Sequence, residues 1–329
     1  MRVLITGAAG FIGSHLCEAL IDDGVYVTAV DRMPVVEAIN LQACLKNSLF
    51  EYKQLDISIL DVLEPIFVGV DVVFHLAALA DIVPSIETPE TYFDSNVVGT
   101  FNVAEICRRT RVHRLVYAAS ASCYGIPQEV PTSEKAAISP QYPYALTKYL
   151  GEEIILHWGK VYGLSVASLR LFNIFGPRSR TNGTYGAVFG VFLAQKLAGK
   201  PLTIVGDGLQ TRDFTYVSDV VSAFKKSMLS DYEGILNIGS GQTHSVDYLA
   251  SLIGGERVHI PKRPGEPDST QANIEKAKRV LNWTPKVKFE EGVSKVLADI
   301  NYWKNAPVWT PESIKTATEP WFKSLEKDS

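Results

Sequence analysis

The chain has few cysteines and histidines for its 329 residues, and it has no long uninterrupted apolar run. No cysteines form a CxxC pair and none lies near a histidine at zinc-ligand spacing, so we expect reduced, buried thiols and no metal site. The longest apolar stretch, around residues 70–83, is interrupted by Asp71, His75 and Asp81. A membrane span needs roughly 18 apolar residues, so we expect no membrane partner. The four cysteines are Cys17, Cys44, Cys107 and Cys123.

Positive charge is not in excess either. The 32 lysines and arginines stand against 36 acidic residues, giving a net charge of −4. Nucleic-acid binding needs a basic face, so we expect no such partner. Residues 2–6 already have the pattern of a strand, so we expect no signal peptide and a cytoplasmic location. With 46% hydrophobic and 21% charged residues, the composition is typical of a globular protein with one large or two medium domains.

Short apolar runs alternate with stretches of helical periodicity through the first half of the chain. This alternation predicts an α/β fold, a Rossmann-type doubly wound parallel sheet. The expected strands are residues 2–6, 25–30, 71–76, 114–118, 166–171 and 235–238. The expected helices are residues 12–23, 91–109, 145–162, 188–198 and 217–229.

A glycine-rich turn lies between the first expected strand and helix. Gly7, Gly10 and Gly13 have GxxGxxG spacing, with Phe11 and Ile12 at the helix start. Glycine lets the backbone approach a ligand closely, and the helix N-terminus offers free N–H groups and a positive dipole end. The strand-turn-helix context predicts that this turn holds the pyrophosphate of a dinucleotide.

Asp31 ends the second expected strand. An aspartate at this place can accept hydrogen bonds from the adenosine ribose and would repel a 2′-phosphate. It therefore favours NAD over NADP, although the adjacent Arg32 weakens the preference.

After residue 171 the composition changes, and turn-forming residues and arginines become frequent. We expect a smaller, mixed α/β substrate-binding domain interleaved with the sheet. The predicted division assigns residues 1–172 and about 214–238 to the NAD-binding domain, and residues 173–213 and 239–304 to the substrate-binding domain. Residues 305–329 read as an irregular tail that docks by its tryptophans.

Tyr144 and Lys148 are spaced i, i+4 and would share one face of a helix. Tyrosine has a reference pKa near 10, and a nearby ammonium and a positive nicotinamide ring would lower it toward that of a general base. Alone, a Tyr-x-x-x-Lys match is also common on ordinary surface helices.

The wider pattern resembles the extended short-chain dehydrogenase/reductase superfamily, and within it the NAD-dependent nucleotide-sugar epimerase/dehydratase family. The resemblance runs from residue 1 to about residue 300. It rests on residues 6–13, 75–78, 96–100, 120–125, 144–148, 169–173 and 206–214.

The resemblance implies roles for residues around the cofactor. Ser120 would assist Tyr144 by hydrogen-bonding the sugar hydroxyl that is oxidised, and Lys148 would hold the nicotinamide ribose. Asn96 would be structural or orient a backbone group near the cofactor. Asp56 and Ile57 would flank the adenine, and the cofactor would be lined by Leu76, Ala77 and Ala78.

The resemblance also implies a substrate site. Asn173, Arg212 and Arg263 match positions that hold the nucleotide diphosphate, a task that suits the planar guanidinium. Glu266 matches a position that binds the nucleotide ribose, and Ser122 lies beside the substrate. Thr270 matches a position whose size affects whether an N-acetyl group fits.

These residues favour a UDP-sugar 4-epimerase that works through a transient 4-keto sugar, with a role in carbohydrate metabolism such as polysaccharide biosynthesis. The alternative is a lyase, a 4,6-dehydratase or decarboxylase. Dehydratases carry an Asp-Glu pair where this chain has Ala121 and Ser122, so elimination lacks an obvious proton donor and acceptor.

A non-catalytic NAD-binding sensor is a third possibility, which the intact Ser120, Tyr144 and Lys148 disfavour. Ala80 stands where some galactose epimerases have lysine, which argues against a strict UDP-galactose assignment. The substrate is therefore not decided among UDP-hexoses, UDP-N-acetylhexosamines and UDP-hexuronates. The resemblance also implies a homodimer built from helices at residues 96–109 and 144–162.

Overall fold

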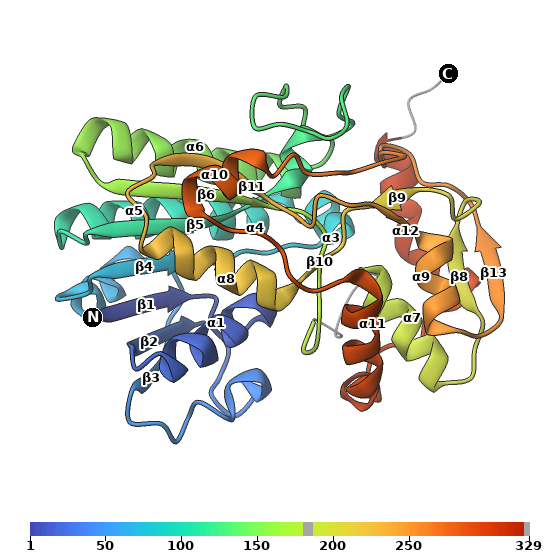
Figure 1. Ribbon diagram of the computed structural model, residues 1–329, viewed down its shortest axis with the longest axis horizontal. Coiled ribbons are helices and arrows are strands. Elements are labelled where there is room, and N and C mark those ends of the chain that lie inside the picture. Colours follow the sequence, from blue (N-terminus) through green and yellow to red (C-terminus); the bar gives the residue numbers. More distant parts are fainter. Residues whose placement is uncertain (180–186, 326–329) are drawn as a thin grey trace.

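The computed structural model describes residues 1–179 and 187–325, in which a parallel sheet and its helices stand beside a smaller group of elements (Figure 1). The strands of this sheet are β1 (Arg2–Thr6), β2 (Tyr26–Asp31), β3 (Phe50–Gln54), β4 (Val72–His75), β5 (Arg114–Ser120), β6 (Ser165–Leu171) and β11 (Gly234–Ile238). They form a seven-stranded sheet in the order β11-β6-β5-β4-β1-β2-β3, with every neighbouring pair parallel. The Rossmann-type fold expected from the sequence is confirmed.

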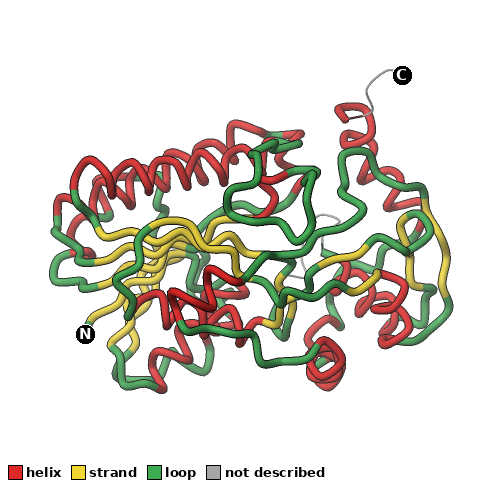
Figure 2. Tube along the Cα trace, turned by 45° about the horizontal axis from the view of Figure 1, so that its top comes forward, coloured by secondary structure: helices red, strands yellow, loops and turns green. Residues whose placement is uncertain are grey.

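Helices cover both faces of the sheet, and Figure 2 shows the strands between two helical layers. Alternate strand residues point to opposite faces: Val3 and Ile5 belong to one buried cluster and Leu4 to another. The first cluster includes residues of α1 (Phe11–Asp22) and α8 (Val217–Met228). The second includes residues of α5 (Gly99–Arg109) and α6 (Pro143–Tyr162). Continuous burial on both faces explains why the central strands read as unbroken apolar runs.

The helix expected over residues 91–109 is not continuous. It consists of α4 (Pro89–Phe93), a π-helical turn η3 (Asp94–Val98) and α5. The wider turn surrounds Asn96, whose side chain is fully buried. Since π-turns inside helices are frequent at functional sites, this departure marks the place where Asn96 leaves the regular helix.

The smaller group of elements follows β6. It contains three two-stranded pairings, namely β7 with β10, β9 with β12, and β8 with β13. Their strands are β7 (Ile174–Phe175), β8 (Leu202–Val205), β9 (Thr211–Arg212), β10 (Thr215–Tyr216), β12 (His244–Ser245) and β13 (Arg257–Ile260). The helices of this group are α7 (Val188–Leu197), α9 (Val246–Ile253) and α11 (Phe289–Ala298). The rings of Phe175, Phe189, Phe214 and Phe289 pack at its centre in two stacked and two edge-to-face pairs.

The expectation of an irregular tail is wrong for most of its length. Residues 311–325 form α12 (Pro311–Leu325), while residues 326–329 lie outside the described part. The buried positions of α12 are Ile314, Thr318 and Trp321, which share one face of a helix. Pro320 obscured this periodicity because proline usually ends a helix.

The remaining helical segments are short connectors. They are α2 (Glu64–Phe67), α3 (Ile82–Glu87), α10 (Glu275–Leu281), η1 (Ile39–Leu41), η2 (Leu60–Val62), η4 (Ala121–Tyr124) and η5 (Ile300–Trp303).

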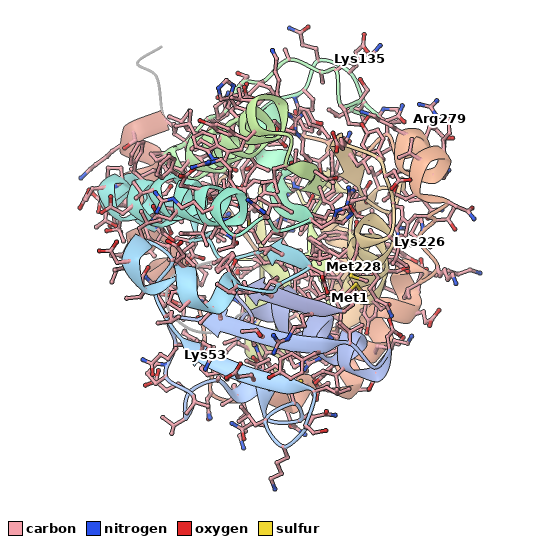
Figure 3. The ribbon with its side chains drawn as sticks, turned by 90° about the vertical axis from the view of Figure 1, so that its left-hand side faces the viewer. Met1, Lys53, Lys135, Lys226, Met228 and Arg279 are labelled. Carbon is pink, nitrogen blue, oxygen red and sulfur yellow. The ribbon has the colours of Figure 1, made fainter. Side chains whose placement is uncertain are left out.

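Most charged side chains lie at the surface, whereas the cysteines lie in the interior. The labelled Lys135 and Arg279 in Figure 3 are exposed at its periphery. All four cysteines are buried and free, as the sequence predicted. Within residues 1–179 and 187–325, no helix is both long and apolar enough to cross a membrane.

Candidate active site

The glycine-rich turn lies against the loop that follows β4. Gly7 has φ +70°, and a Cβ there would lie 2.6 Å from the backbone nitrogen of Ala77. A Cβ on Gly13 would lie 2.9 Å from the Cα of Ala8. In the described structure no side chain caps α1 at Gly10, so its first-turn N–H groups stay available for a ligand. This cradle fits a pyrophosphate, and α1 begins at the predicted Phe11 and Ile12.

Asp31 and Asp56 line one hollow of about 560 Å³ at the edge of the sheet, together with Met33 and Gln54. The carboxylate of Asp31 accepts hydrogen bonds from the backbone N–H of Ala9 at 3.0 Å and of Met33 at 3.1 Å. Burial raises the pKa of Asp31, and these hydrogen bonds oppose the rise. The hollow therefore has the acidic residue that an adenosine ribose would meet.

Ile57 lies elsewhere. Its side chain is buried in the second core cluster, and its backbone oxygen accepts a hydrogen bond from Asn102 Nδ2 at 2.9 Å. The structure thus brings Asp56, but not the side chain of Ile57, into the hollow that Asp31 lines.

His75 connects the first strand to α5 below the turn. Thr100 Oγ1 donates its proton to the backbone oxygen of Asn96 at 2.6 Å, so it accepts from His75 Nε2 at 2.9 Å. His75 Nδ1 must then accept from Thr6 Oγ1 at 2.7 Å. Burial lowers the pKa of His75 to about 3, so the ring is neutral and purely structural at neutral pH.

Asn96 fixes the loop after β4, which holds Leu76, Ala77 and Ala78 half-buried. Its Oδ1 accepts from the N–H of Leu79 at 2.8 Å, and its Nδ2 donates to the oxygen of Leu79 at 3.0 Å. Nδ2 also donates to Thr147 Oγ1 on α6 at 3.0 Å. Asn96 therefore ties the predicted cofactor-lining loop to the helix that carries Tyr144 and Lys148.

Ser120, Tyr144 and Lys148 converge at the carboxyl end of β5. Ser120 Oγ lies 2.8 Å from Ser122 Oγ. Desolvation raises the pKa of Tyr144, whereas its interaction with Ser120 lowers it. The Nζ of Lys148 lies 4.2 Å from the centre of the Tyr117 ring. Burial lowers the pKa of Lys148 to about 7, while Glu152 raises it. Lys148 is thus buried, while Ser120 and Tyr144 are half-buried and stay accessible to a substrate.

The sequence analysis did not predict two buried charged residues near Lys148, Glu152 and Arg170. Glu152 pairs with Arg170 at an Nη2–Oε1 distance of 2.5 Å. Arg170 Nη1 donates to the hydroxyl of Tyr124 at 2.9 Å, and this hydroxyl donates to Asn237 Oδ1 at 2.7 Å. The spacing of Lys148 and Glu152 on one helix face was the only local signal of this network.

The predicted diphosphate-binding arginines meet around Glu266. Arg263 Nη1 lies 3.0 Å from Glu266 Oε1, and Arg212 Nη2 lies 3.6 Å from Glu266 Oε2. Burial lowers the pKa of Arg212, which Glu266 opposes. Two partly buried guanidiniums thus share one carboxylate, leaving positive charge for an anionic ligand.

Asn173 and Thr270 also come together. Thr270 Oγ1 donates to Asn173 Oδ1 at 3.0 Å, and Asn173 has an unusual φ of +30°. Asn173 is exposed and directly precedes β7. The structure therefore joins two predicted substrate residues that lie far apart in the sequence.

Tyr142 is a site residue that the sequence reading missed. Its ring is parallel to that of Tyr144, with centroids 6.3 Å apart and planes 8° apart. Burial raises its pKa, with Glu266 adding to the rise and Arg212 opposing it. Tyr142 therefore lies beside the proposed base and interacts electrostatically with Glu266 and Arg212.

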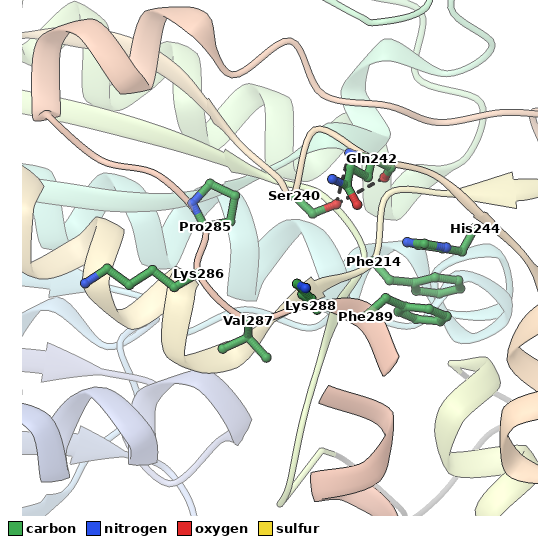
Figure 4. A pocket seen from close by; sticks show the side chains of 9 residues that line it. All are labelled: Phe214, Ser240, Gln242, His244, Pro285, Lys286, Val287, Lys288 and Phe289. Carbon is green, nitrogen blue, oxygen red and sulfur yellow. Dashed lines mark hydrogen bonds between the residues drawn. The ribbon is translucent and has the colours of Figure 1, made fainter. Parts of the chain in front are cut away.

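A second hollow, of about 100 Å³, lies near β9, the strand that carries Arg212 (Figure 4). His244 stacks on Phe289 with ring centroids 4.3 Å apart, and Ser240 Oγ donates to the oxygen of Gln242. None of the predicted site residues lines it. Since His244 pairs with Arg212 across β9 and β12, the stacked rings support the strand that carries this arginine.

Comparisons with known proteins agree with this geometry. The model of the NAD dependent epimerase/dehydratase family matches residues 3–239. The chain belongs to this family, and its dependence on NAD is the one that the glycine-rich turn predicted.

Curated relatives cover nearly the whole chain. A protein of Methanocaldococcus jannaschii named "Putative UDP-glucose 4-epimerase" is 36% identical over 311 residues, covering 92% of this chain and 98% of its own. "UDP-glucuronic acid decarboxylase 1" of Xenopus tropicalis is 35% identical over 307 residues, covering 90% of this chain and 71% of its own.

A solved structure has the same fold. The UDP-glucuronic acid 4-epimerase of Bacillus cereus, in complex with UDP-glucuronic acid and NAD, superposes with a TM-score of 0.85 at 32% identity. The match covers 93% of this chain and 99% of that chain.

Proposed function

We propose that this chain is an NAD-dependent UDP-sugar 4-epimerase. The observation that carries the proposal is the placement of Ser120 near the half-buried Tyr144, whose pKa it lowers, with Tyr144 one helical turn before the buried Lys148. The arginines around Glu266, linked to this group through Tyr142, supply the charge for a nucleotide diphosphate.

In the proposed reaction Tyr144 accepts the proton of the C4 hydroxyl, and Ser120 hydrogen-bonds the same oxygen. Lys148 holds a positive charge near the phenolate and lowers its pKa. NAD, when bound, supplies a reversible hydride acceptor, so net redox is zero. After the 4-keto sugar has turned, the hydride would return to the opposite face of C4, and Tyr144 returns the proton to the C4 oxygen. The glycine cradle, Asp31 and Asp56 are proposed to hold the cofactor, and Asn173, Ser122 and Thr270 to contact the substrate.

The second candidate is a lyase, because one relative is named a UDP-glucuronic acid decarboxylase. The position where dehydratases carry an acid holds Ala121, whose methyl group cannot move a proton. Ser122 is engaged with Ser120. These side chains favour epimerisation.

The test is product analysis by mass spectrometry and NMR with a panel of UDP-hexoses, UDP-N-acetylhexosamines and UDP-hexuronates. We expect an isomer of unchanged mass, and Tyr144→Phe should lower turnover at least about a hundredfold with NAD still bound. Tyr149→Phe, on the same helix but outside the site, is the control. A 4-keto-6-deoxy product or CO₂ would favour the lyase, and full activity of Tyr144→Phe would refute the mechanism.

We also propose the domain division at residues 172/173, 213/214, 238/239 and 304/305, a cytoplasmic location and a homodimer. The dimer proposal is supported by large apolar side chains that are exposed along α4, α5 and α6. These are Phe93, Phe101, Leu146, Val161 and Tyr162. Sedimentation of the wild type and of Phe101→Glu tests it, and a monomeric wild type would refute it.

A further inference from the structure

The C-terminal helix α12 lies beside the substrate site rather than apart from it. It packs against α3, which begins after the loop of residues 76–81. Trp321, on the buried face of α12, is only 3% exposed. A helix from the end of the chain thus reaches the part of the molecule in which Tyr144 acts.

Trp321 contacts two site residues, Arg263 and Tyr142, and also the backbone of Pro264. Its Nε1 donates a hydrogen bond to the backbone oxygen of Pro264 at 2.9 Å. The guanidinium carbon of Arg263 lies 5.4 Å from the centre of its ring, within the range of a cation–π interaction. The centre of the Tyr142 ring lies 6.2 Å from the centre of the Trp321 ring, with the two planes 56° apart. One indole therefore touches the arginine loop and the ring that stacks on Tyr144.

The loop that carries Arg263 is irregular, and within it the guanidinium pairs with Glu266. Residues 261–267 contain three prolines and Gly265, and they form no helix or strand. An arginine binds a diphosphate well only when its planar fork is held in place. The bond from Trp321 to Pro264 fixes the loop backbone, and the indole ring fixes the guanidinium direction.

We propose that Trp321 is a positioning residue: α12 uses it to hold Arg263 for the nucleotide diphosphate and Tyr142 against Tyr144. This inference rests on the proposed function, since it assigns a role at the same substrate site. It gives residues 311–325 a role in substrate affinity. The chemical step itself stays with Ser120, Tyr144 and Lys148.

The test compares Trp321→Leu, which keeps an apolar side chain, with Trp321→Phe, which keeps an aromatic ring without the N–H donor. Loss of one hydrogen bond and one cation–π contact predicts a rise in KM for the UDP-sugar, and in Kd for UDP by calorimetry, of about tenfold in Trp321→Leu. Trp321→Phe should recover part of this loss. Bound NAD should stay unchanged, and kcat should change less than about twofold.

Ile314→Ala is the matched control, because Ile314 is buried on the same face of α12 but makes no contact with the 263–267 loop among the described interactions. We expect its KM to stay within about twofold of wild type. If Ile314→Ala raises KM as much as Trp321→Leu, the effect comes from helix docking and the inference is wrong. If wild type binds UDP and Trp321→Leu binds it equally well, only this inference fails. If wild type binds no UDP at all, the proposed function fails with it.

Discussion

The carboxylate of Glu152 forms an ion pair with the guanidinium of Arg170 at 2.5 Å, and the two side chains are 1% and 3% exposed. Ser168 Oγ also donates to Glu152 at 2.6 Å, so the carboxylate is engaged on both oxygens. Glu152 lies one helical turn after Lys148 and raises the pKa of its ammonium. The Glu152–Arg170 ion pair therefore affects two properties, the stability of the fold and the charge of Lys148 in the site.

Glu152→Gln should destabilise the protein by about 3–5 kcal/mol, because it leaves the Arg170 charge buried and uncompensated. It should also lower the pKa of Lys148 further, because Glu152 raises that pKa in wild type. Lys148 would then lose its charge at a lower pH, and the alkaline limb of the pH–rate profile should move to lower pH. Denaturant unfolding and a pH–rate profile measure the two effects.

Glu291→Gln is the control for that substitution. Glu291 pairs with Lys295 at the surface, where the side chains are 51% and 49% exposed, so its loss should cost less than about 1 kcal/mol. Equal destabilisation by the two substitutions would contradict the role given to burial.

Gly7→Ala should remove NAD binding. The new Cβ would lie 2.6 Å from the backbone nitrogen of Ala77, and the φ of +70° disfavours any side chain. Gly24→Ala is a matched control, since Gly24 has φ +78° but nothing within 4 Å of a Cβ. It should cost about 1–2 kcal/mol of stability and keep NAD. The NAD content of the purified variants distinguishes clash from backbone strain, and a Gly7→Ala protein with full NAD would argue against the cradle.

Stability should fall as the pH drops below about 6.5, through the buried His75. Its pKa is about 3 when folded and near 6.5 when unfolded, so between these values the unfolded chain binds more protons. The contribution is fully present above pH 6.5 and is lost toward pH 3, at up to about 1.4 kcal/mol per pH unit. His75→Gln should be less stable at pH 7.5 but lose less stability between pH 7.5 and 5 than wild type does. The exposed His113→Gln serves as the control, and parallel pH curves for wild type and His75→Gln would contradict this account.

Asp81→Asn should lower the pKa of Tyr144, the proposed general base. The negative charge of Asp81 disfavours the phenolate of Tyr144 and raises its pKa. Removing the charge should therefore move the acid limb of the kcat/KM profile to lower pH. Asp94→Asn, on η3, is a substitution of the same kind for comparison. An acid limb that moves upward, or equally in both variants, would speak against an interaction between Asp81 and Tyr144.

Features that depend on neighbours in the chain could be read from the sequence. The glycine spacing, the Tyr144–Lys148 pair and the central strands all have local signals. The strand β3 (Phe50–Gln54) was missed because it is an edge strand, and its alternating F-E-Y-K-Q pattern is only half-buried. The π-turn at Asp94–Val98 has no periodicity that separates it from an α-helix.

Contacts between distant segments could not be read in this way. Trp321 touches Tyr142 and Arg263 because α12 folds back across the molecule, and no spacing in the sequence encodes this return. Thr270 meets Asn173 for the same reason. The family resemblance named both residues, but only the folded chain joins them.

The order of the sheet also has a consequence for how the protein is made. β11 (Gly234–Ile238) is the edge strand beside β6, and it is synthesised after β7, α7, β8, β9 and β10 of the smaller group of elements. In a nascent chain that has emerged only as far as Leu171, β6 can pair with β5 on one side, and its other side stays open until Ile238 has left the ribosome. A translation pause in this interval would prolong the exposure of that open side to pairing with other chains.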